Sequence, residues 1–426
     1  MIARSRIGSG RGSAGAAHPT GKGVAPLHGV RVLDLSTGIA GPFCTKLLAT
    51  LGASVLKVEP PGEGDPSRRA GPFPGDVPHA EKSGTILHLN TSKQGVTLDV
   101  GSAMGRRLLP ALLRGRHILV ESFAPGAMER WGLGARELQA RFPGLVVVSV
   151  SAFGQDGPYR DWKTSEIITY GMGGAMFSTG LPEREPHKLA GSVAMHQAGY
   201  LAALAAVTSH YGYGARGGVG DHVDVSLFEA LASSQDRRTT QLIAHQYTGI
   251  INGRRPAGTL LGAGVRPCKD GFVNISVTEQ AFERFVRMMG WERALTDPRF
   301  ATVESRAVPG RSDEFDIEYL LPWLLERTME EVCTFAQARR FPFTPVYSPE
   351  TLLQEAFFRE RGLWQAVEHP AAGRLEHGAV NMRFGEARLP PLGAAPMLGE
   401  HNAAVYCGEL GLSRHELAML RQHDVI

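Results

Sequence analysis

The sequence predicts an α/β protein in which a Rossmann-like, doubly wound parallel sheet is accompanied by a second, smaller α+β domain. Short apolar runs rich in β-branched residues alternate with helical stretches through the first half of the chain, as at 30–35, 54–59, 118–122 and 145–150. Such alternation is typical of parallel strands joined by helices on both faces of a sheet. Further along, a glycine-containing joint at 254–264 and the mostly helical texture after it indicate another domain.

These patterns give expected domain boundaries. Residues 1–25 are expected to form a disordered tail, because the segment is rich in glycine, serine, alanine and arginine and holds no acidic residue. The large domain is expected at 26–235 and again at 341–426, with the small domain at 236–340 between them. Further expected elements are helices at 104–114, 195–213, 227–247 and 413–422, a hairpin at 267–277 and a strand at 379–384.

The composition excludes several classes of protein. Lysine and arginine number 45 against 42 acidic residues, so the net charge of +3 offers no strong field for nucleic acid. The four cysteines (Cys44, Cys268, Cys333 and Cys407) form no CxxC pair and the histidines form no HExxH motif, so no metal site is predicted. No apolar run reaches the about 18 residues of a membrane span. We therefore expect a cytoplasmic protein with reduced thiols and no permanently bound cofactor.

The stretch 151–180 holds the strongest candidate for a catalytic group. A buried strand predicted at 145–150 is followed by a Gly/Asp/Pro-rich loop and then by an apolar stretch that Thr164 or Ser165 would cap as a helix. Glu166 then lies in the first helical turn, where the helix dipole favours a carboxylate. Because ligands of open α/β sheets bind outside the carboxyl ends of strands, Glu166 stands where a substrate would lie.

Glu166 also has an ordinary interpretation and two competitors. A glutamate in a first helical turn commonly only caps the helix or meets solvent. Asp156 and Asp161 lie in the same loop and are alternative carboxylates. The local pattern leaves these interpretations open.

The chain begins with a strand–helix–strand unit. A strand at 27–35 is followed by the turn 36–42, a helix, and a second strand at 54–59. The turn does not spell GxGxxG, so a dinucleotide site is only weakly supported. Glu59 ends the second strand, the position of a ribose-binding acid, but two prolines follow it directly, which is unusual for that role.

Six blocks, taken together and in this order, resemble the class III CoA-transferases, the formyl-CoA transferase and carnitine CoA-transferase-like family. They are GVRVLDLSTGIAGPFCTKLLATLGASVLKVEPPGEGD (29–65), LNTSKQGVTLDV (89–100), VESFAPGAMERWGLG (120–134), SAFGQDGPY (151–159), GVGDHVDVSLFEAL (218–231) and PCKDGFV (267–273). The resemblance covers about residues 27–405. It implies a large domain built from both ends of the chain, a small domain between, and an interlocked homodimer.

The resemblance also implies a mechanism. In the family an aspartate attacks the acyl-CoA thioester, and Glu166 aligns with it, one methylene longer. The expected reaction transfers CoA to a carboxylic acid through a carboxylate-bound anhydride and an enzyme glutamyl-CoA thioester. Either the pocket has shifted to suit the longer arm or the transfer reaction is impaired, because a misplacement of about 1 Å can cost about 100-fold in rate.

The family's CoA-binding positions map onto seven residues here: Gly38, Ile39, Ala40, Lys93, Ser122, Phe123 and Arg130. Ile39 stands where the family has a glutamine, Ser122 where it has an asparagine, and Pro60 where it often has an arginine. Lys93 is equally typical of a solvated lysine, and Phe123 of a core residue. The resemblance further implies a glycine lid at Gly258, Gly262 and Gly264, which an ordinary interdomain loop would also explain.

Other functions remain open on the same fold. An acyl-CoA racemase needs an acid/base pair across the substrate's α-carbon, but Ser165 precedes Glu166 where racemases have a histidine. The stretch 188–200 adds no second carboxylate, only His196. A CoA-ester lyase or hydrolase and a non-catalytic CoA-binding subunit are further alternatives. The donor and acceptor acids are not specified by the sequence.

Overall fold

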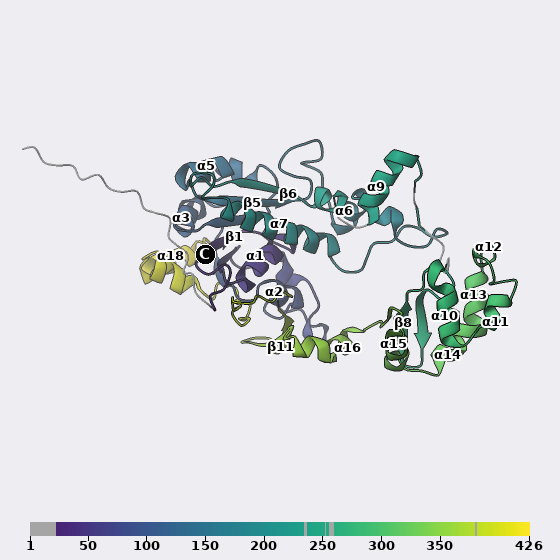
Figure 1. The fold of residues 1–426 in the computed structure, drawn as a ribbon. Coiled ribbons are helices and arrows are strands. Elements are labelled where there is room, and N and C mark those ends of the chain that lie inside the picture. Colours follow the sequence, from purple (N-terminus) through teal and green to yellow (C-terminus); the bar gives the residue numbers. More distant parts are fainter. Residues whose placement is uncertain (1–22, 234–236, 252, 255–259, 380) are drawn as a thin grey trace, which may run out of the picture. The chain divides into compact units, whose positions relative to one another are not determined.

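The computed structural model describes residues 23–233, 237–251, 253–254, 260–379 and 381–426 (Figure 1). The described chain divides into two compact units. The first comprises residues 23–175, Lys188–Leu242 and Gly362–Ile426. The second comprises Met176–His187 and Ile243–Arg361. Both ends of the described chain therefore belong to the first unit.

A six-stranded, wholly parallel sheet forms the centre of the first unit, in the order β3-β2-β1-β4-β5-β6. The strands are β1 (Arg31–Asp34), β2 (Ser54–Glu59), β3 (Gln94–Thr97), β4 (Ile118–Glu121), β5 (Val146–Ser151) and β6 (His222–Ser226). This is the strand order of a Rossmann fold, so the predicted fold class is confirmed. The order reverses between β1 and β4, and such a point opens a crevice at the carboxyl ends of the two strands.

Helices cover both faces of this sheet. The helices of this unit are α1 (Ala40–Thr50), α2 (Gly84–Leu89), α3 (Ala103–Leu113), α4 (Ala127–Arg130), α5 (Ala135–Arg141), α6 (Glu166–Met172), α7 (Val193–Tyr211), α8 (Leu227–Ala232) and α18 (Arg414–Gln422). Helix α9 (Arg237–Thr248) contains residues of both units, and α1, α7 and α8 are among those that contact the strands. Short 3-10 turns occupy Pro66–Arg69 and Pro74–Asp76, and a π-helical segment occupies Ala403–Glu409. An antiparallel hairpin, β10 (Trp364–His369) with β11 (Gly373–Gly378), completes the unit.

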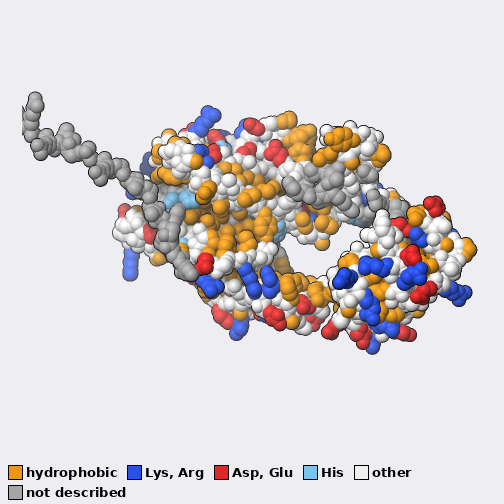
Figure 2. Space-filling view, in the orientation of Figure 1, with side chains coloured by type: hydrophobic (Ala, Val, Ile, Leu, Met, Phe, Trp, Pro, Cys, Tyr) orange, Lys and Arg blue, Asp and Glu red, His pale blue; other side chains and the backbone are white. Residues whose placement is uncertain are grey.

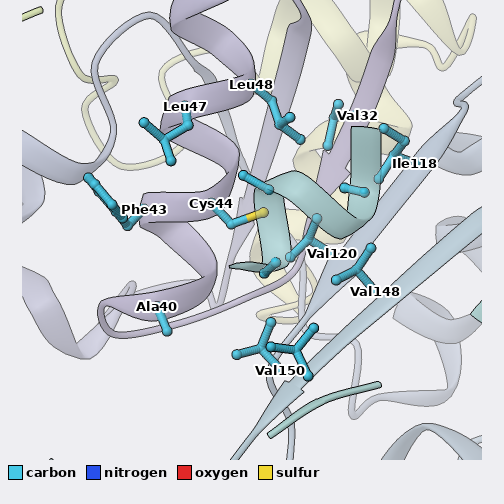
Figure 3. Close-up of a cluster of buried hydrophobic side chains, with 14 of the residues drawn as sticks. Val32, Ala40, Phe43, Cys44, Leu47, Leu48, Ile118, Val120, Val148 and Val150 are labelled. Carbon is cyan, nitrogen blue, oxygen red and sulfur yellow. The ribbon is translucent and has the colours of Figure 1, made fainter. Parts of the chain in front are cut away.

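The parallel sheet has an apolar core on each of its two faces. Successive side chains of a strand point to opposite faces, so alternate residues contribute to each core. On one face Val32, Val120 and Val148 pack with Cys44 and Leu48 of α1 (Figure 3). The same core includes the small residues of α7, which lies beside α1 (Figure 1). On the other face Leu33, Leu119 and Val147 pack with side chains of α3, α5 and α18. Both faces are therefore apolar, which explains why the strands read as continuous apolar runs.

The second unit has its own core and sheet. Its strands are β7 (Gly264–Cys268), β8 (Gly271–Ile275) and β9 (Phe343–Pro345), all antiparallel. Its helices are α10 (Phe282–Met289), α11 (Arg293–Thr296), α12 (Val303–Arg306), α13 (Arg311–Phe315), α14 (Leu321–Leu325), α15 (Met329–Gln337), α16 (Pro349–Gln354) and α17 (Ala356–Glu360), with 3-10 turns at Met176–Ser178 and Glu279–Ala281 and a π-helical segment at Asp316–Leu320. Phe285, Phe315 and Phe343 are buried at its centre.

Three expectations differ from the structure. The second unit ends at Arg361 rather than near 340, because β9 pairs with β8 and keeps that segment in the second sheet. The single helix expected at 227–247 corresponds to two helices in the described residues. Helix α8 ends at Ala232, and the described part of α9 begins at Arg237. The strand expected at 379–384 was wrong for the described residues of that range, because the strands of this region are β10 and β11.

Candidate active site

A cavity of about 610 Å³ lies at the point where the strand order reverses. We call it the switch-point cavity. Its walls come from the turn after β1 and the loop after β4, together with the end of β5 and the loop that follows it. The lining residues are Thr37–Gly41, Ser122–Pro125, Arg130, Val150–Ala152, Arg160–Thr164, Met195 and Leu227. Its position matches the ligand crevice of a doubly wound sheet.

Hydrogen bonds fix the β1–α1 turn at the cavity. The backbone N–H of Thr37 donates to Oγ of Ser122 at 2.9 Å, which ties the β1 turn to the end of β4. The N–H of Gly38 donates to Oδ1 of Asp65 at 3.1 Å, and Gly38 has a φ of 77°, which favours glycine. Helix α1 then begins at Ala40 without an acidic residue in its first turn. The N–H groups of Ala40 and Gly41, two residues that line the cavity, therefore have no carboxylate to accept them in the described structure, and Pro42 has no N–H.

The structure brings together six of the seven expected CoA-binding residues. Gly38, Ile39, Ala40, Ser122, Phe123 and Arg130 all line the switch-point cavity. The side chain of Lys93, by contrast, is fully buried away from it. Its ammonium donates to Asp34 at 3.0 Å, to the carbonyl oxygen of Pro42 at 2.9 Å and to Asn90 at 2.8 Å. These three acceptors use all the donors of a lysine, so Lys93 joins the end of β1 to α1 here.

The cavity also contains basic residues that sequence reasoning missed. Arg160 and Lys163 line it together with Arg130. A Cβ placed on Gly126 would lie 2.5 Å from Nη2 of Arg160 and 3.3 Å from Nη1 of Arg130, so the two guanidinium groups lie side by side. The nearest carboxylate to Arg160 is the exposed Asp161, at 4.0 Å. The sequence signal for these residues is the basic content of the loop after Pro158, which holds Arg160 and Lys163 as well as Asp161.

Glu166 is placed at the edge of this cavity by two helices. It is the first residue of α6, but its carboxylate turns to the N-terminus of α7. Oε1 accepts the N–H of Ala194 at 2.9 Å and Oε2 accepts the N–H of Met195 at 3.3 Å. Lys188 lies 3.8 Å away, and the Glu166 side chain is 16% exposed. Glu166 does not itself line the cavity, but Thr164 and Met195, on either side of it, do.

The competing acids of the loop are in different surroundings. Asp161 lines the cavity, but its side chain is 85% exposed, and Asp156 is exposed as well. Neither carboxylate accepts a hydrogen bond from a helix N-terminus in the described structure. Of the three carboxylates, Glu166 is therefore the one whose position is fixed by its contacts.

A further carboxylate, which the sequence did not suggest, lies beneath the cavity. Glu121 ends β4 and is buried, with Oε2 accepting the N–H of Phe123 at 2.7 Å. Burial raises the pKa of Glu121 to about 7, and hydrogen bonds from Ser149 and Phe123 only partly oppose that rise. The group therefore changes its charge near neutral pH.

Paired charges support the floor of the cavity. Asp34 accepts Oγ1 of Thr45 at 2.6 Å and pairs with Lys93. Burial opposes ionisation of Asp34, but the neighbouring lysines and hydrogen bonds lower its pKa to about 2. Glu59, considered for a ribose, is buried and pairs with Arg68 at 2.7 Å, so its carboxylate serves the scaffold.

The expected lid residues that the structure describes belong to the second unit. Gly258 lies outside the described residues. Gly262 and Gly264 belong to the second unit, where Gly262 has a φ of 67° and packs on Phe285. Gly264 is the first residue of β7.

No three His, Cys, Asp or Glu side chains among the described residues gather as a set of metal ligands. No helix in the described part of the chain is long and apolar enough to cross a membrane.

The sequence model of CoA-transferase family III matches residues 27–402. The chain belongs to CoA-transferase family III. A succinyl-CoA–D-citramalate CoA-transferase of Chloroflexus aurantiacus is 34% identical to it over 409 residues, covering 94% of this chain and 98% of the relative. A formyl-CoA:oxalate CoA-transferase of Streptomyces avermitilis is 29% identical over 415 residues, covering 94% and 99%.

A solved structure supports this family III assignment. The CAIB/BAIF family protein of Brucella suis has a TM-score of 0.79 and 26% identity, covering 90% of this chain and 99% of its own. The family implies CoA or an acyl-CoA as substrate. Helix N-termini and arginine side chains are common phosphate-binding groups, and the switch-point cavity contains both.

Proposed function

We propose that this CoA-transferase moves CoA from an acyl-CoA thioester to a carboxylic acid with Glu166 as the nucleophile. The observation that carries the proposal is the fixed position of the Glu166 carboxylate at the start of α7, between Thr164 and Met195 of the switch-point cavity. Each carboxylate oxygen has two lone pairs and accepts one N–H here, so a lone pair remains for attack. The two N–H groups hold the carboxylate in one orientation, as a nucleophile requires.

The expected chemistry proceeds through two anhydrides. An oxygen of Glu166 attacks the thioester carbonyl, the C–S bond breaks, and CoA leaves as the thiolate. The thiolate attacks the Glu166 carbonyl of this anhydride, which releases the donor acid and leaves a glutamyl-CoA thioester. The acceptor carboxylate attacks that thioester and expels the thiolate again. Attack of the thiolate on the acyl carbonyl of the second anhydride then gives the new acyl-CoA and free Glu166.

The switch-point cavity is the proposed site for CoA. Arg130, Arg160 and Lys163 supply cations that match phosphate oxygens, and the N-terminus of α1 supplies N–H donors. Pro60 stands where the family often has an arginine, so that phosphate contact would be missing. Arg160 would supply a second arginine to the phosphates beside Arg130. Ile39 offers no amide to the thioester carbonyl, so the backbone of the β1–α1 turn would face it.

Small carboxylic acids are the proposed donors and acceptors. The relatives act on succinyl-CoA with D-citramalate and on formyl-CoA with oxalate, by their names. Gly258, Gly262 and Gly264 remain the proposed lid, a role that the positive φ angles of Gly262 and Gly264 would allow.

A homodimer is the proposed assembly. Helix α7 is apolar on every side, yet Leu204 is 63% and Tyr211 is 89% exposed. Figure 2 shows hydrophobic side chains gathered over the area where Figure 1 places α1 and α7. A helix that is apolar all round is normally buried, so a second copy of the chain would cover this surface.

The mechanism is tested by trapping the covalent intermediate. The protein is incubated with a panel of acyl-CoAs, treated with hydroxylamine and mapped by peptide mass spectrometry. We expect a hydroxamate on Glu166, and none in Glu166→Gln. Asp161→Asn, which removes the acid that lines the cavity, should still give the Glu166 adduct. An adduct on Asp161 or Asp156, or no adduct while CoA binds, would overturn the assignment of Glu166.

A further inference from the structure

The loop after β4 forms one wall of the switch-point cavity, and the side chain of Glu121 holds it from beneath. Oε2 of Glu121 accepts the N–H of Phe123 at 2.7 Å, two residues further along the chain. Between these two residues, Ser122 accepts the N–H of Thr37 through its Oγ at 2.9 Å. Phe123, Ser122 and Thr37 all line the cavity. The Glu121 carboxylate therefore stabilises two walls at once, the β4 loop and the β1–α1 turn.

Hydrogen bonds connect Glu121 with the edge of the sheet. Ser149 lies directly opposite Glu121 on β5 and is hydrogen-bonded to it. Oγ of Ser149 also lies 3.0 Å from Nε2 of His222 on β6. Glu121 and Ser149 are each only 4% exposed, whereas His222 is exposed on the outermost strand. The three side chains, which we call the Glu121 row, therefore reach from beneath the cavity to solvent across three neighbouring strands.

The protons of the Glu121 row have two arrangements. With Glu121 protonated, its O–H donates to Ser149, and the Ser149 hydroxyl donates to Nε2 of His222. With Glu121 ionised, the Ser149 hydroxyl donates to the carboxylate, and the Nε2–H of His222 donates to Ser149. Passing from the first to the second moves one proton along each hydrogen bond, while the Nδ1 proton of the exposed His222 leaves to solvent. Glu121 therefore has a path for exchanging its proton although it is buried.

The surroundings of Glu121 favour its neutral form. The charged side chains with the largest effect on it are acids, Glu129 of α4 and Asp224 of β6. On the β1 side the neighbouring core is apolar and includes Leu35. Arg130 lines the cavity, but no ion pair joins it to Glu121 in the described structure. Burial, more than the two acids, raises the pKa of Glu121 to about 7.

We propose that Glu121 is a positioning residue of the CoA site that works as a neutral acid, so that CoA binding takes up a proton into the Glu121 row. The inference rests on the proposed function in taking the switch-point cavity as the CoA site. CoA brings negative phosphates to this cavity, and an ionised carboxylate beneath them would oppose their binding. A proton from the buffer enters at Nδ1 of His222, one proton passes along each hydrogen bond, and the O–H bond of Glu121 forms.

The test follows the CoA affinity of the full chain against pH by isothermal titration calorimetry, without any acid substrate. Because bound CoA favours protonated Glu121, the affinity is highest below the pKa of Glu121 and falls as pH rises through it. Glu121→Gln keeps an acceptor for Phe123 and a donor for Ser149 but cannot ionise. Between about pH 6 and pH 8 we expect the affinity of wild type to fall about 3- to 10-fold more than that of Glu121→Gln.

The matched control is Glu137→Gln, at an exposed acid of α5 that does not line the cavity. This variant should keep the wild-type dependence of CoA affinity on pH. CoA and the other groups of the protein titrate in all three proteins, so only the difference between wild type and Glu121→Gln reports Glu121.

Two further readouts separate proton uptake from a purely structural role. An infrared difference spectrum of CoA binding near neutral pH should show the C=O stretch of a newly protonated carboxyl group in wild type and not in Glu121→Gln. Ser149→Ala should move the midpoint of the CoA affinity profile to higher pH, because the hydrogen bond that it removes favours the carboxylate. If Glu121→Gln does not fold, the wild-type infrared band and the Ser149→Ala midpoint decide the question.

Equal dependence of CoA affinity on pH in wild type and Glu121→Gln would overturn the inference. An affinity loss in Glu121→Gln that is the same at every pH, without the infrared band in wild type, would overturn it as well. A Glu166 adduct without Glu121-dependent proton uptake refutes only the inference. Proton uptake at Glu121 without a Glu166 adduct refutes only the proposed mechanism.

Discussion

Single side chains of the first unit show how burial and charge are balanced around the site. Asp34 pairs with Lys93 at 3.0 Å and Lys57 pairs with Asp65 at 2.8 Å, all four within the core. Glu121 is buried as well, but it accepts only uncharged donors, and its charged neighbours are the acids Glu129 and Asp224. A carboxylate in that position is stabilised in its neutral form, whereas the paired acids remain ionised.

Glu121 should make the stability of the protein fall between pH 5 and pH 8. Its folded pKa of about 7 lies above its ordinary pKa of 4.5, so the folded state binds the proton more tightly. This contribution is fully present below the unfolded pKa and is lost as pH rises through the folded pKa. Glu121→Gln keeps an acceptor for Phe123 but cannot ionise. Between pH 5 and pH 8 the free energy of unfolding, measured with urea, should fall in both proteins. We expect the fall to be about 2–3 kcal/mol smaller in Glu121→Gln than in wild type.

Other groups also titrate between pH 5 and pH 8, but they do so in both proteins. The difference between the wild-type and Glu121→Gln curves of unfolding free energy against pH therefore reports Glu121 alone. Parallel curves for wild type and Glu121→Gln would show that Glu121 ionises normally. A constant offset at every pH would report lost packing and not a shifted pKa.

At the scale of elements, close packing of α1 and α7 positions the β1–α1 turn. A Cβ on Gly199 would lie 2.6 Å from the carbonyl oxygen of Ala40 and 3.0 Å from the Phe43 ring. Ala40 lines the switch-point cavity, so the contact between the helices sets one wall of the proposed CoA site. Glycine allows this approach because it has no side chain.

Gly199→Ala should therefore destabilise the protein, although alanine normally stabilises a helix interior by up to about 1 kcal/mol. Overpacking against Ala40 should cost about 1–3 kcal/mol in urea unfolding. CoA affinity, measured by calorimetry, should fall because the turn is displaced. Gly214→Ala is the control, since its Cβ would meet nothing within 4 Å. A Gly199→Ala variant as stable as wild type would mean that the helices separate at no cost.

Helices and strands that are specified by neighbouring residues could be predicted from the sequence. Those that depend on residues far away in the chain could not. The helix at 414–422 follows the capping residue Ser413, whose side chain accepts the N–H of Glu416 as sequence spacing indicates. The β10–β11 hairpin escaped prediction because most of its residues are exposed or half-buried and show no apolar alternation.

The same limit applies to the site residues. Lys93 resembled a surface lysine because its partner Asp34 lies 59 residues earlier in the chain. Glu166 was placed in the first turn of its own helix correctly, but its hydrogen bonds go to α7, 28 residues later. Spacing along the sequence does not report such contacts, and only the fold brings these groups together.

For the whole molecule, the exposed apolar side chains of α7 and α6 are the feature that the single chain leaves unexplained. Leu204 and Tyr211 of α7 and Ile167 and Ile168 of α6 all face outward. A large apolar surface of this kind marks an interface, and a symmetric homodimer would use the same patch on both copies. Leu204→Glu should weaken such a dimer in light scattering. Val77→Glu, at an exposed apolar residue of a 3-10 turn, should not.

An interlocked dimer makes a stricter prediction than a docked one. Two chains threaded through each other cannot separate until at least one unfolds, so subunit exchange can be no faster than unfolding. Tagged and untagged protein are mixed under native conditions and followed by native mass spectrometry. We expect mixed dimers to form no faster than the unfolding rate extrapolated from urea, and a statistical mixture after joint unfolding and refolding. Exchange within minutes, well ahead of unfolding, would indicate a dimer docked through its surface, and a monomer in light scattering would remove the dimer altogether.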